Sequence, residues 1–252
     1  MSSKEFAALL TRAQKTLFFT GAGMSTGSGI PDFRGPKGLW KRMRPIYFNE
    51  FMASHEARVR HWQYKLEGWR EFRDALPSRA HKALFEMDQM GLLDSLVTQN
   101  IDGLHQLAGH SEDKVTELHG TNRKVECVAC QVLVDPNPLF EQFAESGMPP
   151  VCPCGGFLKS ATVSFGQAMP QDKLEQAFLA AGNADLVVSV GSTLEVEPAA
   201  SIPRSAKDHG ATYVVVNQGP TAHDGVADLR IEDDLNALLP ATVDALRALN
   251  GK

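Results

Sequence analysis

Residues 16–35 read TLFFTGAGMSTGSGIPDFRG, and this stretch decides the fold. The apolar run 16–20 predicts a buried strand, and a glycine-rich turn follows it, as in a dinucleotide-binding βα unit. Gly21 and Gly23 allow a backbone to approach a pyrophosphate closely, although G-x-G also occurs in ordinary tight turns. The third glycine of the usual fingerprint is replaced by Thr26, and a polar segment containing Pro31 follows. The stretch therefore predicts a dinucleotide bound in a non-standard way.

Strand and helix patterns alternate along the rest of the chain. Apolar runs predict further strands over 92–98, 115–118, 185–190, 211–216 and 227–231. Helical spacing of apolar residues predicts helices over 3–14, 80–90, 174–181, 198–208 and 235–249. Such alternation is typical of an α/β fold, here a Rossmann-like, doubly wound parallel sheet.

Two segments interrupt this alternation. Residues 37–75 are rich in Arg, Lys, Trp and Phe and are predicted to be helical around 56–73, whereas residues 121–159 contain every cysteine. Trp62 and Trp69 are one heptad apart, which favours the buried face of a helix over the wall of a substrate channel. We therefore expect a small domain made of a helical module (37–75) and a zinc-binding module (121–159). The discontinuous Rossmann-like domain is expected to comprise 1–36, 76–120 and 160–252.

The composition excludes several classes of protein. The chain has 252 residues, 43% of them hydrophobic, and a formal net charge of −5. This acidic balance argues against a broad nucleic-acid-binding surface, which needs clustered basic residues. No apolar run approaches the roughly 20 residues of a membrane-spanning helix. The N-terminus is polar and has no signal-peptide core, so we expect a cytoplasmic protein. We also expect a monomer with no nucleic-acid or membrane partner.

The four cysteines form two close pairs, Cys127 with Cys130 and Cys152 with Cys154. Four thiolates in two pairs match a tetrahedral structural zinc site, although the second pair is one residue shorter than the common spacing. Two disulfides or four buried free thiols are the alternatives. With sulfur at every position no site remains for water, so the predicted zinc is structural rather than catalytic.

Polar residues follow several of the predicted strands. Gln99 and the segment to His105 follow one strand, His119 follows another, and Gly191 and Asn217 follow two more. These positions lie at the carboxyl edge of a parallel sheet, where ligands of open α/β folds bind. Taken by itself, His119 fits a structural histidine at a strand end better than a catalytic one.

Several motifs, in this order, resemble the sirtuins, the NAD-dependent protein-lysine deacylases. They are GAGMSTGSGIPDFRG (21–35), TQNIDGLH (98–105), LHG (118–120), the paired cysteines, VSFG (163–166) and GSTLEVEP (191–198). The resemblance covers nearly the whole chain and indicates a bacterial-type sirtuin with a four-cysteine zinc module. It implies that NAD is a reactant whose nicotinamide–ribose bond is broken, with no hydride transfer.

The resemblance also implies which residues bind NAD. Arg34 should contact phosphate, Phe33 should shield the ribose after nicotinamide leaves, and Leu235 should lie near the adenine. The remaining positions are expected to line the phosphates, the ribose, the carboxamide of nicotinamide and the adenosine half: Gly21, Ala22, Gly23, Ser25, Asp32, Gln99, Asn100, Ile101, Asp102, Gly191, Ser192, Thr193, Asn217 and Gln218.

His119, Asn100 and Asp102 are the expected catalytic residues. The acyl oxygen would attack the ribose, and His119 would take a proton from a ribose hydroxyl so that the 2′-oxygen attacks the resulting imidate. The products would be lysine, nicotinamide and 2′-O-acyl-ADP-ribose. By the same resemblance, the acyl-lysine peptide would contact Val163, Phe165, Gly166 and Val196.

The expected activity is removal of acetyl or another neutral acyl group. Desuccinylating sirtuins carry Tyr and Arg three residues apart in the helical module, whereas here Tyr64 is followed by Glu67, whose carboxylate would repel an anionic acyl group. The stretch 60–69 instead resembles sirtuins with lipoamidase or ADP-ribosyltransferase activity, so a lipoamidase and a protein mono-ADP-ribosyltransferase remain alternatives. A non-catalytic binding module is less compatible with the presence of His119, Asn100 and Asp102. A nicotinamide dehydrogenase is less compatible with Thr26 in place of the third glycine.

Overall fold

The computed structural model describes residues 2–32 and 44–250. Its larger sheet has six parallel strands in the order β3-β2-β1-β7-β8-β9. Counted along the chain within this sheet, the order is 3-2-1-4-5-6, which is that of a dinucleotide-binding Rossmann domain. The strands are Thr16–Thr20 (β1), Ser95–Thr98 (β2), Val115–Glu117 (β3), Leu186–Val190 (β7), Thr212–Val216 (β8) and Leu229–Ile231 (β9).

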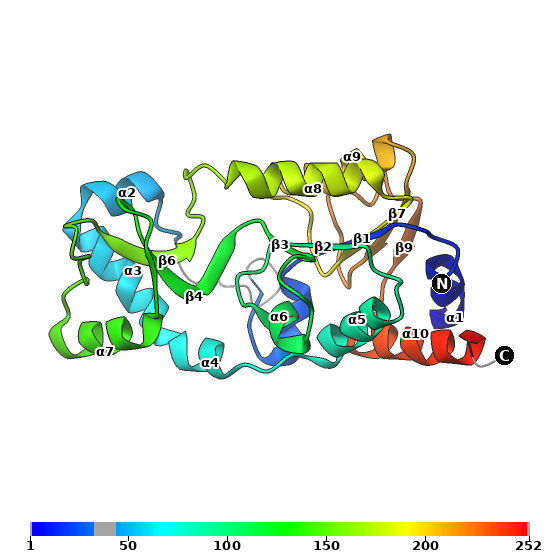
Figure 1. The fold of residues 1–252 in the computed structure, drawn as a ribbon, viewed down its shortest axis with the longest axis horizontal. Coiled ribbons are helices and arrows are strands. Elements are labelled where there is room, and N and C mark those ends of the chain that lie inside the picture. Colours follow the sequence, from blue (N-terminus) through cyan, green and yellow to red (C-terminus); the bar gives the residue numbers. More distant parts are fainter. Residues whose placement is uncertain (1, 33–43, 251–252) are drawn as a thin grey trace.

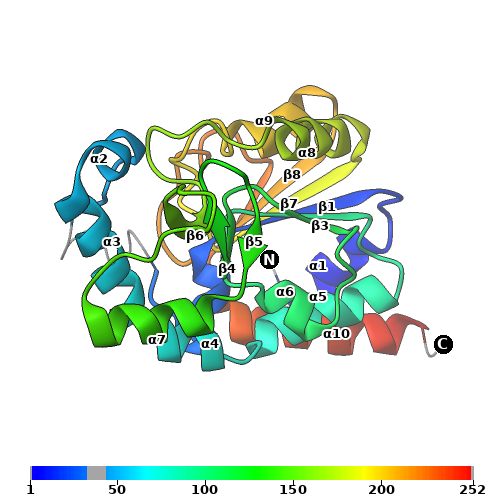
Figure 2. The ribbon, with the colours of Figure 1, turned by 60° about the vertical axis from the view of Figure 1, so that its left-hand side comes forward.

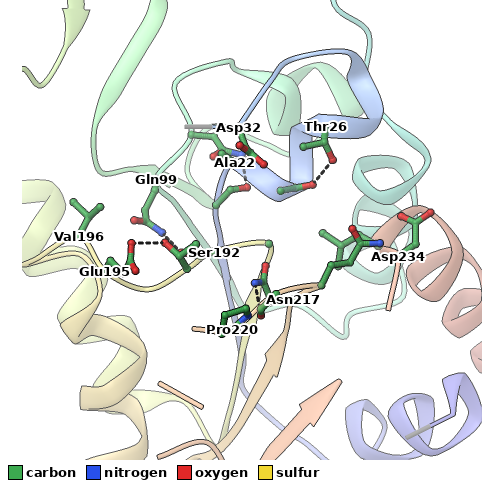
Figure 3. A pocket seen from close by; sticks show the side chains of 18 of the residues that line it. Ala22, Thr26, Asp32, Gln99, Ser192, Glu195, Val196, Asn217, Pro220 and Asp234 are labelled. Atoms are coloured by element: carbon green, nitrogen blue, oxygen red, sulfur yellow. Dashed lines mark hydrogen bonds between the residues drawn. The ribbon is translucent and has the colours of Figure 1, made fainter. Parts of the chain in front are cut away.

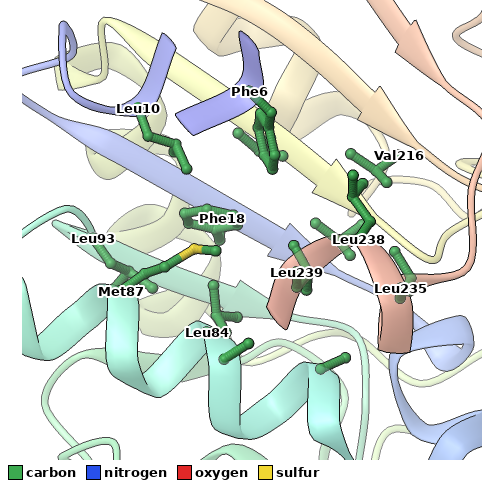
Figure 4. Packing of buried hydrophobic residues seen from close by; sticks show 14 of the residues in the cluster. Phe6, Leu10, Phe18, Leu84, Met87, Leu93, Val216, Leu235, Leu238 and Leu239 are labelled. Atoms are coloured by element: carbon green, nitrogen blue, oxygen red, sulfur yellow. The ribbon is translucent and has the colours of Figure 1, made fainter. Parts of the chain in front are cut away.

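Helices cover both faces of this sheet (Figure 1). One face carries α1 (Ser3–Leu10), α5 (Arg79–Gln89) and α10 (Leu235–Asn250), and the other carries α8 (Gln171–Asn183) and α9 (Ser201–Asp208). On the first face, Phe18 of β1 packs with Leu84, Met87 and Leu239 in a fully buried cluster (Figure 4). Because both faces are buried, β1, β7 and β8 are mostly apolar along their whole length and do not alternate with polar residues.

The small domain is built around a second, antiparallel sheet with the order β5-β4-β6 (Figure 2). Its elements are β4 (Gly120–Cys127), β5 (Leu133–Val134), α7 (Pro136–Ser146) and β6 (Leu158–Thr162). The helices α2 (Phe48–Ala53), α3 (His55–Glu67) and α4 (Trp69–Asp74) lie at the same end of the molecule. The two insertions expected from the sequence thus meet, whereas the residue boundaries assigned to the domains stay a prediction.

Trp62 and Trp69 join the helices of the small domain to α7. Both are buried, and their rings lie 5.2 and 4.7 Å from that of Phe140. They therefore form the core of the small domain, as expected, and neither lines a cavity described below. The single helix expected over 56–73 is wrong in one respect, since it is interrupted at Gly68, where α3 ends and α4 begins.

Two short elements complete the part of the chain that the structure describes. A 3₁₀ helix (η1, Ala22–Ser28) follows β1, in agreement with the expectation that no regular α-helix follows the glycine-rich turn. Helix α6 (Leu104–Ala108) follows the 98–103 segment. No helix among the described residues is long and apolar enough to cross a membrane.

Candidate active site

The candidate active site lies at the carboxyl edge of the large sheet, as the strand-end pattern predicted. A cavity of about 650 Å³ opens there, and most of the residues expected to bind NAD line it (Figure 3). The lining residues from that set are Gly21, Ala22, Gly23, Asp32, Gln99, Asn100, Gly191, Ser192, Thr193, Asn217, Gln218 and Leu235. Phe33 and Arg34 lie outside the described residues. We call this space the first cavity.

Three glycines at the floor of the first cavity allow two loops to interlock. The Gly23 N–H donates to the Gly191 carbonyl oxygen at 2.8 Å. A Cβ on Gly23 would lie 2.8 Å from the Gly191 Cα, and one on Gly21 would lie 2.7 Å from the Gly191 oxygen. Gly191 itself has φ +63°. These residues are therefore glycines because backbone meets backbone, a reason the sequence did not reveal.

Asn100 and Asp102, in the segment after β2, form hydrogen bonds that hold the glycine-rich loop in place. Asn100 Nδ2 donates to the Gly21 carbonyl oxygen at 3.0 Å and to Ser25 Oγ at 3.2 Å. The Ser25 hydroxyl donates to Asp102 Oδ2 at 2.6 Å, and the Leu104 N–H donates to Oδ1 at 2.9 Å. Burial raises the pKa of Asp102 in spite of these hydrogen bonds. Ser25 and Asp102 are buried against each other and are not among the residues lining the first cavity.

A second cavity, of about 520 Å³, adjoins the first. All four residues expected to contact the acyl-lysine peptide line it: Val163, Phe165, Gly166 and Val196. Ile101, expected to contact NAD, lies here rather than in the first cavity. His119, Gln99 and Val196 line both cavities, so the two spaces meet at His119.

A hydrogen bond to Gln99 indicates the tautomer of His119. Its Nδ1 lies 3.0 Å from the carbonyl oxygen of Gln99. Because a carbonyl oxygen can only accept, Nδ1 carries the hydrogen in the neutral ring, and Nε2 is the nitrogen that can take up a proton. Gln99 is held in turn by the hydrogen bond from its Nε2 to Ser192 Oγ at 2.8 Å. This arrangement suits a general base.

The segment after β6 borders the second cavity without forming a strand. The Val163 N–H donates to the His119 carbonyl oxygen, and the Phe165 carbonyl oxygen accepts from the Phe48 N–H, each at 2.9 Å. Phe165 is 37% exposed. These bonds anchor the segment to both α2 and the His119 loop, at the place where a substrate peptide is expected.

The four cysteines fit a structural zinc ion. Their Sγ atoms all lie within 4.8 Å of one another, with 3.5 Å between Cys127 and Cys154 and 3.8 Å between Cys130 and Cys152. A tetrahedral zinc–thiolate site with bonds of about 2.3 Å places its sulfurs about 3.8 Å apart, whereas a disulfide requires about 2.05 Å. The disulfide alternative is therefore wrong, and zinc would hold β4 to the 151–157 loop.

Sequence reasoning missed several lining residues. Thr26, Glu195, Gly219, Pro220 and Asp234 also line the first cavity. Of these, Glu195 lies inside a motif already noted and could have been found from it. In the second cavity, Tyr64 lines the wall, but Glu67, whose carboxylate was expected to repel an anionic acyl group, is exposed and does not.

Comparison with known proteins agrees with this geometry. A model of the Sir2 family matches residues 21–198. An "NAD-dependent protein deacetylase" of Rhodopseudomonas palustris is 42% identical over 232 residues, which cover 92% of each chain. Another of that name, from Thermodesulfovibrio yellowstonii, is 39% identical and covers 95% of this chain and 93% of its own.

Solved structures show the same likeness. One described as Sir2 with a p53 peptide and NAD⁺ has a TM-score of 0.87 and 33% identity, with 100% of both chains covered. A second, bound to a propionylated peptide, has a TM-score of 0.86 and 33% identity and covers 97% of this chain and 98% of its own.

Proposed function

Because this chain belongs to the Sir2 family, we propose that it consumes NAD to remove acetyl or other acyl groups from lysine side chains of proteins. The observation that carries the proposal is the meeting of the two cavities at His119. An NAD molecule in the first cavity and an acyl-lysine in the second would bring the ribose and the acyl oxygen together beside that imidazole. The products would be nicotinamide, 2′-O-acyl-ADP-ribose and the free lysine.

His119 is proposed to act as the general base through Nε2. With Nδ1–H donated to Gln99, the ring can accept a proton from a ribose hydroxyl without changing its orientation. The proton would then reside on an imidazolium stabilised by the same carbonyl oxygen. The hydroxyl oxygen, freed of its proton, would attack the carbon of the former acyl group.

Asn100 and Asp102 are proposed to position the nicotinamide half of NAD. Asn100 lines the first cavity and fixes the Gly21 loop, so its amide would orient the ribose and the water that completes the reaction. Asp102 suits the N–H donors of the carboxamide of nicotinamide, but it now accepts the Ser25 hydroxyl. Binding would therefore exchange that hydrogen bond for one to the carboxamide.

The decisive experiment incubates the protein with NAD and a panel of acyl-lysine peptides, and measures lysine peptide and O-acyl-ADP-ribose by mass spectrometry. We expect stoichiometric formation of both, and a loss of at least about 100-fold in His119→Ala. His209→Ala is the matched control, because His209 is exposed at the end of α9. Equal activity of wild type and His119→Ala would contradict the proposal.

The same panel separates the alternatives that use the NAD site. Nicotinamide release without any acyl peptide, with ADP-ribose label appearing on protein, would identify a mono-ADP-ribosyltransferase. Fastest turnover of a lipoyl-lysine peptide would identify a lipoamidase. The lining of the second cavity by Val163, Phe165 and Val196 favours an acyl-lysine substrate over transfer to an arbitrary side chain.

A further inference from the structure

Two neighbouring residues of β4 hold the backbone of the segment that follows β2. The strand runs from the end of β3 into the small domain (Figure 1). Its Asn122 N–H donates to the Ile101 carbonyl oxygen at 2.8 Å, and its Arg123 Nε donates to the Asp102 carbonyl oxygen. Asp102 is proposed to bind the carboxamide of nicotinamide, so both bonds act on the backbone beside that site.

These bonds occur where β4 is not regularly paired. The register of β4 with β6 shifts between residues 120 and 125, and Asn122 and Arg123 lie in that interval. The Asn122 side chain is buried, and its Oδ1 accepts from Lys65 Nζ of α3 at 2.9 Å. At its other end β4 reaches Cys127, one of the four clustered cysteines. The strand therefore connects the segment after β2 to both modules of the small domain.

The Arg123 side chain also packs on Gly103. The glycine has φ +65°, and a Cβ at that position would lie 2.8 Å from both Cδ and Nε of Arg123. The turn therefore accommodates Arg123 only because residue 103 has no side chain. Asp102 precedes this glycine, and its Oδ1 accepts the Leu104 N–H at 2.9 Å. Arg123 thus contacts the backbone that determines where the Asp102 carboxylate points.

The place that Arg123 occupies is unfavourable for stability. The side chain is partly buried, and its Nη2 has no hydrogen-bond partner within residues 2–32 and 44–250. No acid in those ranges forms an ion pair with it. Burial lowers the pKa of Arg123, although the charges of Asp102 and Glu117 act in the opposite direction. Because an unpaired buried donor costs free energy, this position points to a role in the reaction rather than in stability.

We infer that Arg123 is a positioning residue for nicotinamide: through the Asp102 carbonyl oxygen it holds the carboxylate where the carboxamide binds. Arg123 lines neither cavity, so it acts through the segment that it holds. The inference rests on the proposed function and adds a residue that sets the affinity for the nicotinamide half of NAD. The adenosine half is expected at Gly191 and Asn217, after β7 and β8, and should not depend on Arg123.

The first test separates the two halves of NAD. Exchange of labelled nicotinamide into NAD, in the presence of an acetyl-lysine peptide, gives a KM for nicotinamide. Calorimetry gives the Kd of ADP-ribose, which is NAD without its nicotinamide. In Arg123→Met the KM should rise by about tenfold, because the Asp102 carbonyl oxygen loses a charged donor, whereas the Kd should stay within about twofold. An unchanged KM, or equal losses for both ligands, would overturn the inference.

Two substitutions of equal reach isolate the hydrogen bond. Arg123→Met ends in a methyl group where Nε lies, whereas Arg123→Gln places an amide N–H there. Arg123→Gln should therefore keep the KM for nicotinamide within about threefold of the wild-type value. Lys124→Met, at the next and exposed position of β4, removes the same charge and should leave the KM unchanged. Equal effects of Arg123→Met and either of the other two substitutions would overturn the inference.

A double variant tests whether Arg123 acts through Asp102. Asp102→Asn by itself is expected to lower the rate of nicotinamide exchange by about tenfold. Adding Arg123→Met should lower the rate by less than about twofold more, because the carboxylate that Arg123 positions is already absent. Independent effects would multiply to about 100-fold and would overturn the inference.

Folding and the proposed function are checked separately. Thermal melting and ADP-ribose binding show whether each variant is folded. Should Arg123→Met not fold, Arg123→Ala, which removes the donor and leaves no methyl group against Gly103, should raise the KM for nicotinamide to the same extent. If wild type neither deacylates any peptide nor exchanges nicotinamide, the proposed function fails. If it does both and the Arg123 variants behave as wild type, only the positioning role fails.

Discussion

At the residue scale, the glycines of the nucleotide loop act through steric fit. Gly23 and Gly191 bring two backbone segments within hydrogen-bonding distance, and any Cβ at either position would collide with backbone atoms. Backbone cannot yield as the end of a flexible side chain can, so substitution must separate the loops that line the first cavity.

Gly23→Ala should therefore lower the free energy of unfolding by about 1–3 kcal/mol and weaken NAD binding. Gly182→Ala is the matched control, since Gly182 lies in α8 with open space around its Cα and should be neutral or stabilised by up to about 1 kcal/mol. Urea denaturation and NAD titration provide both measurements. Equal effects of the two substitutions would contradict the steric argument.

The hydrogen bonds that Asp102 accepts predict the effect of replacing its carboxylate. It accepts the Ser25 hydroxyl and the Leu104 N–H on different oxygens. Asp102→Asn replaces one of these acceptor oxygens with an NH₂ group, so one bond must be lost. We expect NAD-dependent turnover and nicotinamide exchange to fall by about tenfold or more. Asp94→Asn, at an exposed position before β2, should leave both rates unchanged, and an equal loss there would point to a general effect of charge.

At the scale of elements, the zinc module and the helical module share one core. Trp62 Nε1 donates to the Leu158 carbonyl oxygen of β6, and Trp69 Nε1 donates to Asn137 Oδ1 of α7, both at 3.1 Å. The cysteines that bracket β4 and β6 therefore support the packing of α3 as well. Because α3 also lines the second cavity, loss of zinc should affect substrate binding without involving chemistry at the metal.

Removal of the metal with a chelator should expose Trp62 and Trp69 and shift tryptophan emission to longer wavelength, with loss of deacylase activity. NAD binding should weaken less, because the first cavity belongs to the large sheet. Emission and metal content are measured on the same sample, and readdition of zinc should restore the spectrum. Unchanged emission after complete removal of the metal would show that the shared core does not depend on it.

At the scale of the whole molecule, a cluster of buried histidines makes stability depend on pH. His81, His105 and His110 lie in a row, with ring centroids 4.9 and 5.8 Å apart. Burial lowers the pKa of all three, that of His81 to about 4. As the pH falls, the unfolded chain therefore takes up protons near pH 6.5 before the folded protein does, and Asp88, which is hydrogen-bonded to His110, partly offsets the effect there.

The histidines should therefore lower the free energy of unfolding as the pH falls from 6.5 toward 4, by on the order of 2–3 kcal/mol from His81 alone, whereas Glu117, whose pKa burial raises to about 7, acts in the opposite direction. Urea denaturation at pH 7.5 and 5.0 measures the change. His81→Asn should reduce the pH dependence, whereas His209→Asn, at an exposed position, should not. Stability that increases on acidification would refute this account.

Much of the architecture could be predicted from local sequence because the signals were strong and close together. The run 16–20 matches β1, and polar residues after the strands lie at the edge where both cavities open. The two cysteine pairs in the sequence predicted that all four thiol groups lie close together in the fold. Where a helix is interrupted was harder to predict. The pattern over 56–73 did not reveal the interruption at Gly68, since glycine occurs inside many helices.

By itself, then, the sequence determined the parallel sheet, the identity of the cysteine cluster and the motif residues, since each depends on neighbours along the chain. The tertiary structure alone decided which side chains face one another. It placed Ile101 in the second cavity, buried Ser25 against Asp102, and brought Lys65 rather than Glu67 to the cavity wall. Those outcomes depend on contacts between segments far apart in the chain, such as the Ser25–Asp102 hydrogen bond across 77 residues and the Lys65–Asn122 hydrogen bond across 57. No local pattern encodes such contacts.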